Sequence, residues 1–159
     1  MSCDVAVAAY LFLASTGPAG AQPQVVPAVA APTTVATEPL FADIVGRAHQ
    51  LKARVEAYRT AKGLKTAPTA LPLPAFDRFQ ADIEALSALD MKGHVELAQR
   101  GTDGDLKCIL RGISQDLPVK LKQLTQASTG AAEDAALRDM AYLLNDNVEV
   151  ITAPPEPAA

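Results

Sequence analysis

Apolar residues recur at helical spacing in four separate segments of the chain, and none of these segments alternates apolar and polar residues in twos. The clearest segment follows residue 40, where apolar positions step by three and four residues without a break, as in a coiled-coil seam. This pattern predicts a helix from about Leu40 to Lys62, ended by Gly63 in the left-handed conformation. The seam consists of Phe41, Ile44, Ala48, Leu51, Val55 and Tyr58.

The second and third helices follow closely on one another. The second is expected over residues 75–100, where six apolar residues lie along one side. The third is expected to start at a capping box formed by Thr102 and Asp105. Pro118 lies within the apolar stripe of this third helix. Since proline removes a backbone donor and clashes with the preceding turn, we expect a kink or a break near residues 115–117.

A fourth helix is expected after Gly130, with apolar residues at Leu137, Met140, Leu144, Val148 and Ile151, and the prolines near the C-terminus should end it near Thr152. The connection at residues 64–74 has three prolines, so it is either an ordered strap over the core or a binding surface. Four amphipathic helices predict an all-α fold, an antiparallel four-helix bundle with disordered N- and C-terminal extensions. A two-helix hairpin that dimerises is the alternative.

The ends of the chain predict export. Residues 5–14 form an uncharged apolar run that is too short to span a bilayer, and Ala19-Gly20-Ala21 resembles a signal-peptidase site. We therefore expect a signal peptide at 1–21, a Pro/Ala-rich disordered tether at 22–38, the helical bundle at 39–152 and a disordered tail at 153–159.

This interpretation predicts a periplasmic or secreted protein with no transmembrane helix in the mature chain. The residues before the apolar run lack Lys and Arg and include Asp4, which departs from an ordinary signal peptide. A start codon assigned too far downstream would explain this departure. The alternative is a cytosolic protein with an apolar, disordered N-terminus.

Composition narrows the function classes. The net charge of −4 argues against a nucleic-acid binder. The sequence has no phosphate loop, no nucleophile beside a base and no metal-ligand cluster, so we expect neither an enzyme nor a cofactor.

The charges are unevenly distributed along the chain. Residues 39–65 hold six basic and two acidic residues, a net of +4, whereas residues 130–159 hold one basic and six acidic residues, a net of −5. Attraction between the first and fourth helices as neighbours would explain this. Alternatively, the first helix offers its basic side, including Arg47 and Arg54, to an acidic partner, either a protein or an envelope component.

Cys108 is the only cysteine left once residues 1–21 are removed. A helical wheel places it away from the core, with Lys107 and Arg111 beside it. We therefore consider Cys108, Lys107 and Arg111 as candidate binding residues, and a covalent homodimer through Cys108 as one outcome. The alternative is that Cys108 is a small buried residue.

Asp90 and His94 are one turn apart on the second helix, and Asp90 falls where the apolar stripe should continue. A carboxylate and an imidazole at this spacing share either a hydrogen bond or a metal ion. The sequence as a whole indicates an exported, non-catalytic helical protein that acts as a binding or interaction module. Two alternatives are a metal- or redox-responsive module using Cys108 with Asp90 and His94, and a helical envelope-stress chaperone with an exposed apolar groove.

Overall fold

The computed structural model describes residues 35–61 and 63–153, which all lie in one compact unit that begins at Thr33. Four α-helices account for most of these residues: α1 (Pro39–Arg59), α2 (Phe76–Arg100), α3 (Gly104–Thr125) and α4 (Gly130–Thr152). Short 3₁₀ turns precede α1 (η1, Val35–Thr37) and α2 (η2, Leu64–Thr66). The described part of the chain contains no strand, so the predicted all-α fold is confirmed.

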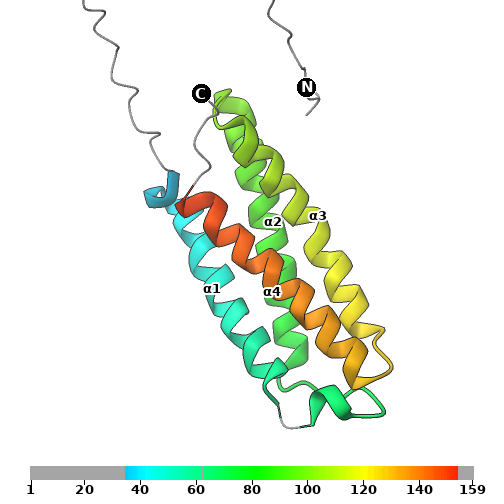
Figure 1. The fold of residues 1–159 in the computed structure, drawn as a ribbon. Helices are drawn as coiled ribbons and strands as arrows, with labels where there is room; N and C mark the ends of the chain where they lie inside the picture. The colour runs from blue at the N-terminus through cyan, green and yellow to red at the C-terminus, as the bar shows by residue number, and fades with distance from the viewer. Residues whose placement is uncertain (1–34, 62, 154–159) are drawn as a thin grey trace, which may run out of the picture. The chain divides into compact units, whose positions relative to one another are not determined.

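The four helices form an up-down-up-down antiparallel bundle (Figure 1). Neighbours along the chain pack side by side, and α4 returns to pack against α1, which closes the bundle. The predicted signal peptide and most of the predicted tether and tail lie outside the described residues. Val35, which falls within the predicted tether, has its side chain buried against the bundle.

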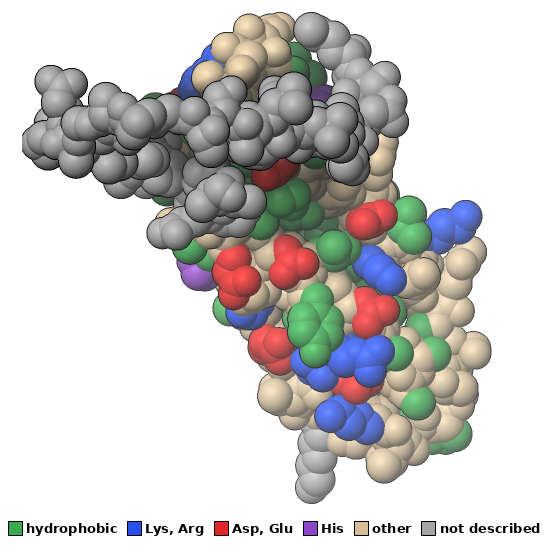
Figure 2. Space-filling view, turned by 45° about the horizontal axis from the view of Figure 1, so that its top comes forward, with side chains coloured by type: hydrophobic (Ala, Val, Ile, Leu, Met, Phe, Trp, Pro, Cys, Tyr) green, Lys and Arg blue, Asp and Glu red, His purple; other side chains and the backbone are tan. Residues whose placement is uncertain are grey.

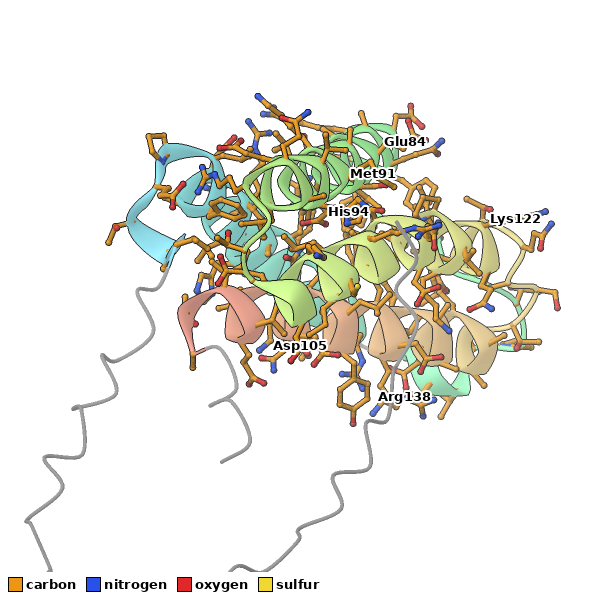
Figure 3. All side chains as sticks on the ribbon, turned by 90° about the horizontal axis from the view of Figure 1, so that it is seen from above. Glu84, Met91, His94, Asp105, Lys122 and Arg138 are labelled. Atoms are coloured by element: carbon orange, nitrogen blue, oxygen red, sulfur yellow. The ribbon has the colours of Figure 1, made fainter. Side chains whose placement is uncertain are left out.

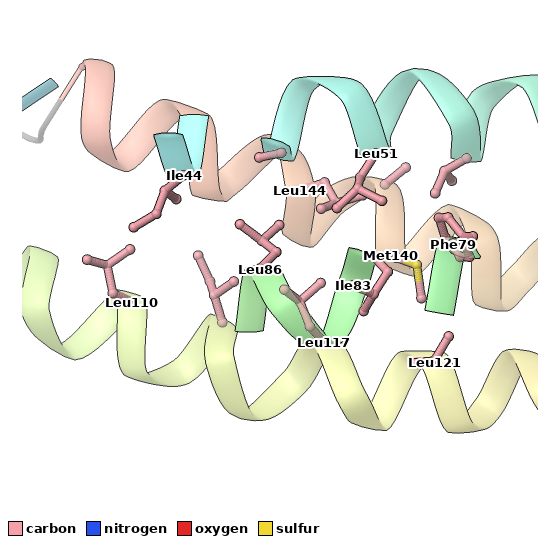
Figure 4. Close-up of a cluster of buried hydrophobic side chains, with 14 of the residues drawn as sticks. Ile44, Leu51, Phe79, Ile83, Leu86, Leu110, Leu117, Leu121, Met140 and Leu144 are labelled. Atoms are coloured by element: carbon pink, nitrogen blue, oxygen red, sulfur yellow. The ribbon is translucent and has the colours of Figure 1, made fainter. Parts of the chain in front are cut away.

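The core is built from the positions that the periodicity selected. All six residues of the predicted α1 seam are buried, and they are the only buried residues of that helix. Aliphatic side chains from α2, α3 and α4 meet them between the helices (Figure 4). Burying a side chain of this size contributes roughly 1.5–3 kcal/mol each, so this common core is the main stabilising feature of the bundle.

Two helix ends differ from the predictions. Helix α1 ends at Arg59 instead of Lys62, although Gly63 does take the left-handed conformation with a φ of 86°. The predicted capping box of Thr102 and Asp105 does not form. Asp103 is the N-cap of α3, with a φ of 49° and no side-chain cap bond, whereas a capping box requires an extended N-cap residue.

Helix α3 continues through Pro118, so of the two predicted outcomes, a kink or a break, the break does not occur. Because Pro118 has no N–H, the carbonyl of Ser114, four residues earlier, loses its partner within the helix. The hydroxyl of Ser87, on α2, donates to this carbonyl oxygen at 2.7 Å. A neighbouring helix therefore supplies the missing donor, and α3 continues to Thr125. None of the described helices is long and apolar enough to cross a membrane.

Candidate functional site

A charged groove of about 280 Å³ lies between α1 and α2. It brings together the two predicted binding arginines of α1, Arg47 and Arg54, with a third arginine, Arg78 of α2. Sequence reasoning missed Arg78, because only the packing of the two helices places it opposite the α1 arginines. The groove is lined by Asp43, Arg47, Gln50, Leu51, Arg54, Arg78 and Asp82.

Two aspartates hold the arginines of this groove in place. Arg47 Nε donates to Asp43 Oδ1 at 3.0 Å, and Arg54 donates to Asp82 Oδ2 at 3.2 Å. Arg78 Nε lies 4.0 Å from the same Asp82 oxygen. Each guanidinium has five N–H donors, and these bonds engage one donor of Arg47 and one of Arg54. The groove thus retains donors for a further anion, and its three arginines outnumber its two aspartates.

The proline-rich connection of residues 64–74 is an ordered strap that several hydrogen bonds tie to the bundle. Leu64 is buried, and Tyr58 Oη donates to the carbonyl oxygen of Pro74 at 2.6 Å. The N–H of Leu71 donates to the buried carboxylate of Glu133 at 2.8 Å. Gly130 passes so close to the strap that a Cβ there would lie 1.8 Å from the carbonyl oxygen of Leu64. The strap is therefore locked onto the start of α4.

An apolar pocket of about 450 Å³ lies between this strap and the C-terminal half of α1. Its walls are alanine, leucine and proline side chains with the ring of Tyr58, and Arg54 stands at its edge. The pocket is lined by Arg54, Ala57, Tyr58, Ala61, Leu64, Leu71, Pro72, Leu73, Pro74 and Ala75. Sequence reasoning allowed the strap as a binding surface but did not identify this pocket, which depends on how the strap folds back on α1.

Asp90 and His94, the predicted metal pair, are engaged separately in the structure. Asp90 is fully buried, and Nδ2 of the equally buried Asn147, on α4, donates to both of its carboxylate oxygens at 3.0 Å. The side chain of His94, on α2, points toward α3 (Figure 3), and its Nδ1 lies 2.7 Å from the carbonyl oxygen of Lys107. No group of three or more His, Cys, Asp or Glu among the described residues is arranged to hold a metal ion.

The buried Asp90 carboxyl has an unusual protonation equilibrium. Burial raises its pKa to about 7, and the hydrogen bonds from Asn147 act in the opposite direction. Asn147 Oδ1 is the one buried side-chain oxygen or nitrogen without a hydrogen bond in the described part of the chain. With a pKa near neutrality, Asp90 changes its charge within the buried contact between α2 and α4 as the pH passes through about 7.

Cys108, Lys107 and Arg111 lie on the first turns of α3, and Cys108 is half-buried where the wheel predicted exposure. The Cys108 sulfur is engaged in a disulfide, so it does not carry the free thiol that the sequence indicated. Arg111 is exposed and Lys107 is half-buried. Their role in binding, and a covalent homodimer through Cys108, stay predictions.

The opposite charges of α1 and α4 meet directly. Arg59 Nε lies 3.2 Å from Asp134 Oδ1, and Lys65, on the strap, lies 4.0 Å from the other oxygen of Asp134. Lys52 donates to the side-chain oxygen of Asn145, on α4. Arg59 and Lys65 thus pair with an acidic residue of α4, and Lys52 bonds a neutral amide of the same helix, whereas Arg47 and Arg54 lie in the groove on the side of α2.

Comparison of the chain with protein-family models, with curated proteins and with solved structures found no match.

Proposed function

We propose that this chain is an exported, non-catalytic interaction module that binds an acidic segment of a partner protein in the α1–α2 groove. The observation that carries the proposal is the convergence of Arg47, Arg54 and Arg78 on one hollow, with most of their donors still available. Guanidinium groups pair with carboxylates through two parallel N–H donors, which gives both affinity and orientation. The groove therefore suits an incoming carboxylate.

The shape and charge of the molecule favour an acidic protein segment over an anionic membrane. A bilayer surface is broad and requires a broad cationic face, whereas the arginines line a hollow flanked by Asp43 and Asp82. On the face seen in Figure 2, acidic and basic side chains are interspersed.

The export part of the proposal rests on the apolar run of residues 5–14 and on Ala19-Gly20-Ala21. The intact mass of protein recovered from the periplasm or the medium tests this. We expect a chain that lacks residues 1–21. Recovery of the full-length chain from the cytosol would contradict export.

The binding part is tested with a labelled polyglutamate peptide at low ionic strength. The variant Arg47→Gln/Arg54→Gln keeps the packing of the side-chain stems but removes two guanidiniums. Since a hydrogen bond to a charged group contributes roughly 1.5–3 kcal/mol, we expect a loss of affinity of at least about tenfold. The control variant Lys92→Gln/Lys122→Gln removes two cations from other faces and should bind like the wild type.

Two results would overturn this proposal. One is equal affinity of the groove variant and the control variant for the peptide. The other is that vesicles containing phosphatidylglycerol bind the wild type more tightly than the peptide does and lose this binding in the groove variant, which would assign the groove to a lipid headgroup.

A further inference from the structure

The charged groove and the apolar strap pocket meet at one residue. Arg54 lines both hollows, and its side chain is 36% exposed, held between Asp82 on one side and the strap pocket on the other. Its charge also reaches Tyr58, inside the strap pocket: burial raises the pKa of the Tyr58 hydroxyl, and Arg54 opposes this shift. The two hollows are therefore parts of one continuous surface, charged at one end and apolar at the other.

The apolar end is formed before any ligand arrives. The bond from Tyr58 to the Pro74 carbonyl fixes one edge of the strap, and the bond from Leu71 to Glu133 fixes the other. Pro72, which lies between these anchors, restricts the backbone further. A rigid pocket loses little conformational entropy when it is filled, so an apolar group that enters it is bound with most of its burial energy retained.

We propose that the segment bound here carries a large apolar residue directly beside its acidic residues. The carboxylates lie on Arg47 and Arg54, and the neighbouring apolar side chain enters the strap pocket. This inference rests on the proposed function and deepens it, because it adds a specific apolar requirement to a general preference for acidic segments. Charge alone would select any acidic peptide, whereas the adjoining pocket distinguishes among them.

The pocket suits a protein side chain better than the acyl chain of a lipid. Its volume of about 450 Å³ is at the smaller end of ligand pockets. Several of its lining residues, including Ala57, Pro72 and Pro74, are themselves exposed. An acyl chain in such a shallow hollow would keep much of its surface in water, whereas one aromatic or leucine side chain at the end of an acidic segment fits within it.

The test compares two peptides that differ at one residue, a Glu-Glu-Phe sequence and a Glu-Glu-Ser sequence in the same glycine–serine flanks. Binding to the full chain is measured by fluorescence anisotropy. We expect the phenylalanine peptide to bind about tenfold more tightly than the serine peptide. The variant Ala57→Trp fills the pocket from an exposed position of α1 and should abolish this difference. Its control, Ala53→Trp, places the same side chain one turn earlier, at an exposed position that lines neither hollow.

A second pocket variant, Leu73→Ser, removes one wall from the strap side and should also abolish the difference, with circular dichroism confirming that the helices are retained. Equal affinity of the wild type for the two peptides would overturn the inference, as would an unchanged difference in the Ala57→Trp variant. Failure of the proposed function would give a different result. Both peptides would then bind the Arg47→Gln/Arg54→Gln variant as tightly as they bind the wild type.

Discussion

Two buried polar side chains connect helices on opposite sides of the bundle. Asp90 of α2 and Asn147 of α4 are both fully buried and bonded to each other. Next to them, Gly93 also takes a core position, where an added Cβ would come within 3.1 Å of the Leu110 side chain. A buried polar pair of this kind is less stabilising than a well-packed apolar pair. However, any other packing of α2 against α4 would leave both polar groups buried without hydrogen-bond partners. The pair therefore fixes how α2 and α4 face each other.

We predict that Asp90 makes stability fall as the pH rises through neutrality. The pKa of Asp90 is about 7 in the folded protein, against 3.8 for an ordinary aspartate, so the folded state holds the proton more tightly. This contribution is fully present below about pH 4 and is lost as the pH rises through about 7. At 1.36 kcal/mol for each pKa unit, the loss between pH 5 and pH 8 is roughly 2–3 kcal/mol.

The variant Asp90→Asn isolates this effect, because it keeps the shape of the side chain and removes the titration. Its side-chain oxygen still accepts from Asn147 Nδ2, as an Asp90 oxygen does in the wild type. Urea unfolding from pH 5 to pH 8 measures the difference between the two proteins. We expect the variant to gain stability relative to the wild type as the pH rises. A difference that does not change with pH would show that Asp90 is not protonated in the folded state.

At the scale of the helix, Pro118 is tolerated because another helix completes its hydrogen bonding. We predict that Ser87→Ala lowers the free energy of unfolding by roughly 1–2 kcal/mol, since the carbonyl of Ser114 then has no donor. In a Pro118→Ala background the same substitution should cost clearly less, because the restored N–H of residue 118 bonds that carbonyl within the helix. Chemical denaturation of the wild type, the two single variants and the double variant gives the coupling energy between Ser87 and Pro118. Equal costs in both backgrounds would show that the Ser87 hydroxyl does not compensate for the proline.

The same element shows what the sequence could and could not predict. Periodicity identified all four helices and the complete α1 seam, because burial of apolar side chains on one face is a property of local spacing. It allowed a break near Pro118 that does not occur, because the compensating Ser87 is 27 residues away in sequence and reaches Ser114 only after α2 and α3 pack. For the same reason Arg47 and Arg54 were recognised as basic residues of one helix, while Arg78 and the strap pocket that complete the site were not.

At the scale of the whole molecule, the basic α1 divides its charge between two neighbours. Toward α4, Arg59 pairs with Asp134, and the two side chains are 21% and 17% exposed. On the side facing α2, Arg54 pairs with Asp82 of that helix, and these side chains are 36% and 40% exposed. Arg47, on the same side, pairs with Asp43 of its own helix, and these side chains are 44% and 48% exposed. An ion pair that is largely shielded from water is screened less than an exposed one. The ion pair on the α4 side is therefore better shielded from solvent and salt than the ion pairs on the α2 side.

This division predicts different coupling energies for the two ion pairs. A double-mutant cycle with Arg59→Gln and Asp134→Asn should give a coupling of about 1 kcal/mol, whereas the exposed pair, tested with Arg47→Gln and Asp43→Asn, should give about 0.3 kcal/mol or less. Thermal unfolding at low and high salt measures both coupling energies. The coupling between Arg47 and Asp43 should vanish first as salt is added. Equal couplings would mean that Arg47 contributes to the fold as much as Arg59 does. Because a guanidinium that contributes little to folding can change partners at little cost in stability, a small coupling at Arg47 is also what a binding groove on the α2 side requires.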